Sequence, residues 1–193
     1  MKNFAMKTKT LHSVQLLEYT LVLEPGIAIN NAIREEIEKE ELIPSKNYYE
    51  ILLGSFQAKE ELENTIVRWL QRIFNLQGSF LVTLNNFSGR PPHNIHLRIQ
   101  NPEEIKKMIN QLKMIDHFIQ TNDCPPAILC YAPQMEISNN IPENSFYKIL
   151  NEFSAKSFHE SFIADKIKLY RRSQFETSLQ LVCSFSLPPG SKY

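Results

Sequence analysis

The sequence predicts an α+β fold in which two similar lobes turn their central strands toward a shared cleft. The main observation is the order of elements along the 193 residues: strand, helix, strand, helix, strand occurs twice and is followed by a last strand. The composition agrees, because hydrophobic residues make up 42% and charged residues 22%, as in globular proteins with a substantial core. The halves share this order without convincing residue identity, so the repeat is one of architecture.

The first half of the chain supplies five of these elements. A stretch rich in β-forming residues predicts a strand over 14–25, and apolar residues at helical spacing predict a helix around 29–37. The short apolar stretch 47–55 predicts the central strand of this half. An apolar stripe predicts a helix over 58–74, and a strand over 79–89 completes the half.

The second half repeats the series. A strand is expected over 93–100, after a turn that contains two prolines. Asn101, Pro102 and two acidic residues then predict a helix start, with an apolar face that runs on to Ile119. The stretch 126–138 predicts the second central strand, and 142–153 predicts another helix.

The end of the chain predicts two further extended segments, over 158–172 and 175–187. In the latter, alternate residues are mostly apolar and predict one half-buried face. The residues expected on that face are Phe175, Thr177, Leu179, Leu181, Cys183, Phe185 and Leu187. We expect residues 1–13 to form a flexible N-terminus and residues 14–193 to form a single bilobal domain.

The charge balance argues against a protein that tracks along nucleic acid. Lys and Arg together number 21, as do Asp and Glu, so there is no basic excess, although a local basic groove stays compatible with the sequence. No segment approaches the roughly 20 apolar residues of a membrane span, and the N-terminus lacks the apolar region of a secretory signal. We therefore expect a cytoplasmic protein with no membrane contact.

The sequence gives little support for a metal or a cofactor. The three cysteines, Cys124, Cys130 and Cys183, lack the paired spacing of a zinc site and are interpreted as reduced core thiols. His93 and His96 lie three residues apart on a predicted strand, so they point to opposite faces and are poorly placed to share a metal. No Gly-rich phosphate loop is present. We expect no cofactor and no metal.

Four segments carry a family resemblance: "LLGSFQA", "LNNFSGRPPHNIHLRI", "NDCPP" and "FHESFIADKIKLYRR". With the two-lobed order, they resemble the 2'-5' RNA ligase-like branch of the two-histidine (2H) phosphoesterase superfamily over residues 14–188. The resemblance implies two pseudo-symmetric lobes of antiparallel sheet plus helices around a central cleft. It also implies one His-x-Thr/Ser motif on each central strand, with one His as general base and the other as general acid on a 2',3'-cyclic or 2'-5' phosphodiester. The hydroxyls would bind the phosphate.

All four motif positions depart from this pattern. Counting from the neighbouring segments places Tyr49 and Ile51 at the first motif, and Gln134 and Glu136 at the second. Gln does not titrate, and Tyr, with an ordinary pKa of about 10, is a poor base near neutral pH. An ionised Glu136 would repel a phosphate at short range. The sequence therefore predicts that the reaction of the family is lost.

Two hypotheses about function follow. The first is a non-catalytic protein that binds a nucleotide, an RNA end or a protein partner in the cleft, with an oligomeric state that the sequence does not determine. The second is an enzyme of altered chemistry, a phosphoesterase or related hydrolase, in which Glu136 is the base and Tyr49 the acid. The expected ligand contacts are Tyr49, Gln134, Glu136, Lys168, Tyr170 and Arg171.

Several of these contacts also have a purely structural interpretation. Lys166, Lys168 and Tyr170 alternate along one face of their strand, with Arg171 near its end. They suit either an anion-contacting rim of the cleft or a solvated strand edge. Tyr49 is equally well interpreted as an ordinary strand aromatic.

Overall fold

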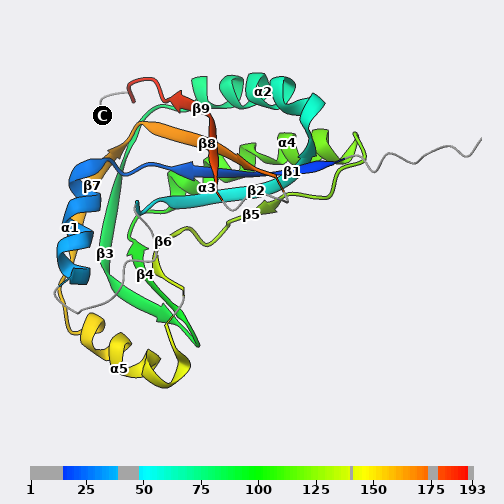
Figure 1. The fold of residues 1–193 in the computed structure, drawn as a ribbon. Helices are drawn as coiled ribbons and strands as arrows, with labels where there is room; N and C mark the ends of the chain where they lie inside the picture. The colour runs from blue at the N-terminus through cyan, green and yellow to red at the C-terminus, as the bar shows by residue number, and fades with distance from the viewer. Residues whose placement is uncertain (1–14, 39–47, 140, 174–177, 191–193) are drawn as a thin grey trace, which may run out of the picture.

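The chain forms one antiparallel sheet, bent into two arms, with helices packed against it (Figure 1). A computed structural model describes residues 15–38, 48–139, 141–173 and 178–190. The strands are β1 (Leu16–Leu23), β2 (Ile51–Lys59), β3 (Phe80–Arg90), β4 (Asn94–Ile99), β5 (Ile128–Leu129), β6 (Gln134–Ser138), β7 (His159–Ala164), β8 (Lys166–Arg172) and β9 (Gln180–Ser186). The helices are α1 (Ile27–Glu38), α2 (Glu63–Asn75), α3 (Glu103–Gln111), α4 (Lys113–Gln120) and α5 (Glu143–Ser154), with a 3₁₀ turn η1 (Glu60–Leu62) before α2.

The strand order divides the sheet into two lobes. Strands run in the order β7-β3-β4-β6-β2-β1-β8-β9, with β5 also paired to β2. The first lobe is the half from β2 to β9 with β5, and α2 packs against β9 on it (Figure 1). The second lobe is the half from β7 to β6, which α1 and α5 contact. The predicted α+β fold, with two lobes of antiparallel sheet, is confirmed.

The two lobes join where β2 meets β6. Ile51 and Met135 are the paired residues at this junction, and both side chains are fully buried. Each lobe contains strands from both halves of the sequence, because β8 and β9 pair beside β1 while β3 pairs with β4 and β7. The predicted repeat of elements therefore forms two interleaved lobes around a common sheet. No helix in the described ranges is long and apolar enough to cross a membrane.

Most predicted elements form where apolar periodicity indicates, but the strand predicted over 126–138 is two strands, β5 and β6, and two helix details also differ. The helix expected to run to Ile119 is two helices, α3 and α4, which meet at Leu112. Asn101 does not cap α3: its amide donates to the Leu81 carbonyl at 2.9 Å, and its side-chain oxygen accepts from the Thr83 amide at 3.0 Å. Asn101 thus ties the start of this helical segment to β3.

The end of the chain differs from its prediction more strongly. The segment 158–172 is two strands, because β7 pairs with β3 in one lobe and β8 pairs with β1 in the other. In β9 the register shifts, since Leu169 opposes Cys183 while Tyr170 opposes Leu181. This bulge turns Leu181 away from the face of Cys183. The single apolar face predicted for 175–187 is therefore wrong at Leu181.

Leu179 and Leu181 are accordingly solvent-exposed, at 51% and 55% of their surface, whereas Phe185 and Leu187 are buried. Phe175 and Thr177, which were predicted on the same face, lie outside the described residues, as does the predicted N-terminal segment 1–13.

Asn30 fixes the position of the chain just before β2. It is the one polar residue among the described residues that is classed as buried, at 3% exposure. Its amide donates to the Gly26 carbonyl at 2.9 Å, and its side-chain oxygen accepts from the Tyr49 amide at 2.5 Å. The Tyr49 side chain is completely buried, and its hydroxyl makes no hydrogen bond with a described residue.

We predict that Asn30→Ala lowers the free energy of unfolding by about 1–3 kcal/mol, because the buried Tyr49 amide loses its acceptor. Urea denaturation measures this change. Asn31→Ala, at an exposed position on the same helix, is the matched control and should cost less than about 0.5 kcal/mol beyond helix-propensity effects. Equal stabilities of the two variants would contradict this role of Asn30.

Candidate functional site

A cleft of about 560 Å³ lies where the two lobes meet. The first lobe contributes side chains from β1, β2 and β8, and the second contributes side chains from the end of β3 and from β6. The segment 128–132 and Leu179 also line it. The lining includes Glu50, Leu52, Arg90, Tyr131, Gln134, Glu136 and Tyr170.

The register of β2 places different residues in the cleft from those predicted. Glu50 and Leu52 line it, whereas Tyr49 and Ile51 are fully buried in the core. Neighbouring residues of a strand point to opposite faces, so a shift of one residue exchanges the two sets. The expectation that Tyr49 and Ile51 face the cleft is therefore wrong.

A signal for the correct register exists in the sequence. Apolar residues at Tyr49, Ile51 and Leu53 alternate with the charged Glu50, and the charged position is the one that should avoid the core. All three apolar side chains are fully buried. The alternation of apolar and charged residues therefore predicts which side chains of this segment face the cleft.

Gln134 and Glu136 line the cleft from the opposite lobe. Because Ile51 opposes Met135 in an antiparallel pair, Glu50 lies on the side of Glu136, and Leu52 lies on the side of Gln134. The residues two apart that face the cleft are therefore Glu50 and Leu52 from one lobe, and Gln134 and Glu136 from the other. The family resemblance implies that such cleft-facing pairs carry its two motifs. These pairs contain no imidazole and no hydroxyl.

A hydrogen-bond network covers the second-lobe wall of the cleft. The Asn94 amide donates to Glu136 Oε2 at 2.9 Å, and the Asn94 oxygen accepts from the Gln134 amide at 3.4 Å. His96 Nδ1 lies 2.9 Å from the same Asn94 oxygen. Because that oxygen can only accept, the proton of this bond belongs to His96 Nδ1, which leaves Nε2 as the second titrating atom. Asn139 also donates to Glu136, at 3.1 Å.

His96, which the sequence suggested only as a poorly placed metal ligand beside His93, belongs to this hydrogen-bond network. It opposes Glu136 across β4 and β6, so the two side chains share a face. Burial lowers the pKa of His96, and the positive charges of Arg90 and Arg98 lower it further, while Glu136 acts in the opposite direction. His96 therefore favours the neutral form near neutral pH. His93 points elsewhere, with Nδ1 2.8 Å from the Ile141 carbonyl oxygen.

Of the three contacts predicted on β8, the structure places only Tyr170 among the cleft-lining residues. Its hydroxyl donates to Glu50 Oε1 at 3.2 Å, and burial and the charge of Glu50 raise the pKa of Tyr170. Lys168 instead donates to Glu24 Oε1 at 2.9 Å.

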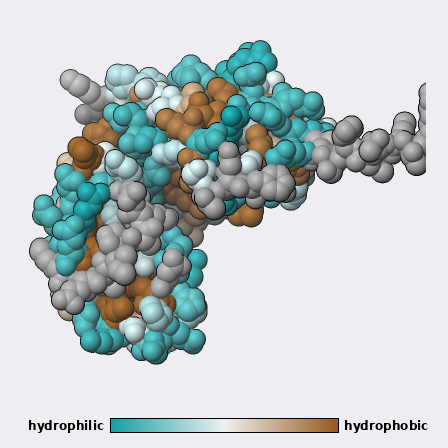
Figure 2. Space-filling model, viewed as in Figure 1, coloured by the Kyte–Doolittle hydropathy of each residue, from teal (hydrophilic) through white to brown (hydrophobic). Residues whose placement is uncertain are grey.

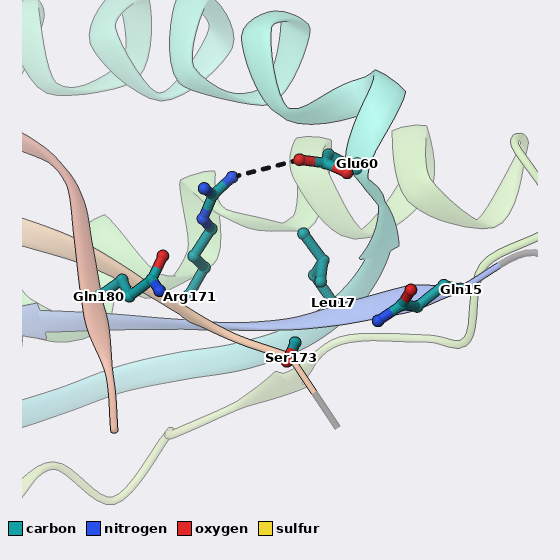
Figure 3. Close-up of a pocket in the computed structure, with 6 residues that line it drawn as sticks. All are labelled: Gln15, Leu17, Glu60, Arg171, Ser173 and Gln180. Carbon is teal, nitrogen blue, oxygen red and sulfur yellow. Dashed lines mark ion pairs between the residues drawn. The ribbon is translucent and has the colours of Figure 1, made fainter. Parts of the chain in front are cut away.

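Arg171 lies on the other face of β8, away from the cleft. It pairs with Glu63 at 2.9 Å and with Glu60 at 3.7 Å, beside α2. Figure 3 shows Arg171 reaching toward Glu60 in a separate pocket of about 280 Å³. The strand alternation that brings Tyr170 to the cleft necessarily turns Arg171 away from it, so its predicted contact is wrong.

The chemistry available in the cleft is limited. Burial raises the pKa of the Cys130 thiol, so this lining residue is a poor nucleophile. Among the described residues, no group of three or more His, Cys, Asp or Glu side chains is placed to hold a metal ion. Apolar surface appears on both lobes (Figure 2), and the exposed apolar side chains at the cleft include Leu52, Ile128 and Leu179. The cleft thus combines carboxylates, an amide and tyrosine hydroxyls with exposed apolar surface.

Solved structures share this fold. E. coli LigT in its apo form superposes with a TM-score of 0.65 at 15% identity, over 90% of this chain and 99% of LigT. LigT complexed with 3'-AMP gives 0.62 at 12% identity, over 90% of this chain and 98% of LigT. A Thermus thermophilus protein gives 0.68 at 13% identity, over 89% of this chain and 98% of its own. LigT has also been crystallised with NADP+, ATP and phosphate.

These likenesses confirm the predicted fold, which this chain shares with LigT and with the Thermus thermophilus protein. Comparison with protein-family models gives no match, and comparison with curated protein sequences gives none either.

We predict that Arg90→Gln and Arg98→Gln each raise the pKa of His96, because each removes a positive charge that lowers it. Glu136→Gln should lower the pKa of His96 relative to the unmodified protein, since the Glu136 charge stabilises the imidazolium. NMR titration of the imidazole nitrogens measures all three changes. If neither arginine substitution moves the His96 titration, the electrostatic account of this wall is incorrect.

Proposed function

We propose that this chain is a non-catalytic binding protein of the 2H phosphoesterase fold, whose cleft holds a nucleotide or an RNA end. The observation that carries the proposal is an open cleft between the lobes whose central-strand positions hold Glu50, Leu52, Gln134 and Glu136. The scaffold that forms a cleft is kept, while the side chains that the family reaction needs are replaced.

Loss of the reaction follows from the chemistry of these side chains. Gln134 cannot exchange a proton, and Leu52 offers no hydrogen bond to a phosphate. Glu50 and Glu136 are carboxylates that repel a phosphodiester held between them. A missing general acid or base costs on the order of 10²–10⁴ in rate, and both are replaced in this cleft.

The cleft still offers contacts to the other parts of a nucleotide. Tyr131 and Tyr170 present aromatic rings, on which bases stack. The carboxylates, Gln134 and the apolar Leu52 suit the donor groups and faces of a nucleoside better than its phosphate. LigT, which shares the fold, has been crystallised with 3'-AMP and ATP, and this supports a nucleotide as the ligand class.

The alternative enzyme, with Glu136 as base and Tyr49 as acid, loses its support. Both side chains would have to reach one substrate, yet Tyr49, just before β2, is buried in the core and does not line the cleft. Burial also raises the pKa of Tyr49, which weakens it as an acid.

We predict no hydrolysis of 2',3'-cyclic nucleotides above background, together with stabilisation by a bound nucleotide. A nucleotide at 100 times its dissociation constant should add about 2.7 kcal/mol to the free energy of unfolding. Thermal unfolding with 3'-AMP and a hydrolysis assay on the same purified protein measure both. Turnover that survives purification and disappears in Glu50→Gln would instead identify an enzyme.

We predict further that restoring both motifs in the correct register creates activity. The required substitutions are Glu50→His, Leu52→Thr, Gln134→His and Glu136→Thr. Two acid–base groups should then recover about 10²–10⁴ in rate each, while single substitutions gain little because the groups act as a unit.

The matched control moves the first pair by one residue, to Tyr49→His and Ile51→Thr, and keeps the second pair of substitutions. It places polar groups in the core, so it should be less stable and inactive. A folded but inert variant in the correct register would show that the cleft differs from an active one beyond these four positions.

A further inference from the structure

A second, smaller pocket adjoins the cleft on the second lobe. It measures about 350 Å³ and lies between β4, the start of α3 and the segment that leads into β6. Tyr131, Ala132 and Gln134 line both this side pocket and the cleft, so the two spaces adjoin at these residues. The side pocket is otherwise lined by His96, Arg98, Ile99, Pro102, Lys106 and Pro133.

The charges of the two spaces are opposite in character. The cleft holds two carboxylates, Glu50 and Glu136, and one guanidinium, Arg90. The side pocket is lined by Arg98, Lys106 and His96, and no acidic side chain from the described part of the chain lines it. An anion that enters from the cleft therefore meets repulsion at the strand junction and attraction in the side pocket.

The arginine of the side pocket is available for a ligand. Arg98 is exposed and forms no ion pair with any residue in the described part of the chain, whereas Lys106 lies 3.1 Å from Glu103. Arg98 opposes Gln134 across β4 and β6, which places a guanidinium beside an amide that also lines the cleft. A planar guanidinium binds a phosphate through two parallel hydrogen bonds.

We propose that the phosphate group of a bound nucleotide lies in this side pocket, on Arg98 and Lys106, while its nucleoside lies in the cleft. This inference rests on the proposed function and adds a displaced phosphate site to it. Tyr131, which is 46% exposed and lines both spaces, lies where the nucleoside and phosphate parts of one ligand would join. His96 Nε2 supplies a further donor when the imidazole is protonated.

Isothermal titration calorimetry with 3'-AMP, adenosine and inorganic phosphate tests the proposal. The intact protein should bind 3'-AMP about ten- to one hundred-fold more tightly than adenosine, as expected for charged hydrogen bonds to the phosphate. Arg98→Met and Lys106→Met should reduce or remove this preference and leave adenosine binding unchanged. Arg72→Met, at an exposed position on α2, is the matched control and should leave the preference for 3'-AMP over adenosine unchanged.

The outcomes separate the side pocket from the proposed function. If 3'-AMP and adenosine bind equally, or if Arg90→Met removes the preference and Arg98→Met does not, the phosphate site is wrong while nucleotide binding stands. If neither nucleoside ligand binds but inorganic phosphate binds and loses affinity in Arg98→Met, the side pocket stands and the proposed function fails. If none of the three probes binds, both are overturned.

Discussion

The pairing of Ile51 with Met135 joins the two lobes into one sheet, and the character of the cleft depends on it. An antiparallel pair turns the flanking residues to a common face, so this contact decides that Glu50 and Leu52 meet Glu136 and Gln134. Asn30 supports the same register, because its side-chain oxygen accepts a hydrogen bond from the Tyr49 backbone amide. With the backbone held in this way, the core and the cleft receive alternate residues of one strand.

This alternation separates the residues that maintain the fold from those that determine chemistry. Tyr49, Ile51 and Met135 are fully buried and join the lobes through packing. The side chains between them line the cleft and are exposed or half-buried, so they can change with less effect on the scaffold. A cleft with carboxylates at its centre and basic groups at its side follows from such changes, and it suits a ligand whose negative charge lies off the strand junction.

The sequence predicts the fold well because the relevant signals are periodic and extend over many residues. The apolar stripe of α2 and the repeated order of strands and helices are signals of this kind. Both can be recognised even when the boundary of an element is misplaced by one residue. The site depends instead on which of the two alternating sets of side chains of a strand faces the cleft. One residue decides whether Tyr49 or Glu50 faces the cleft and whether Tyr170 or Arg171 does.

Other features of the site arise only from pairing between distant segments. The bulge in β9 exposes Leu181, and the register of β4 with β6 brings His96 and Arg98 beside Glu136 and Gln134. A crystal structure of the protein grown with 3'-AMP would test this arrangement most directly. We expect the nucleoside to lie between the lobes, against a cleft wall that contains Glu50 and Leu52. A structure in which Tyr49 and Ile51 face that space, or in which the nucleotide lies outside it, would overturn both the register and the proposed binding site.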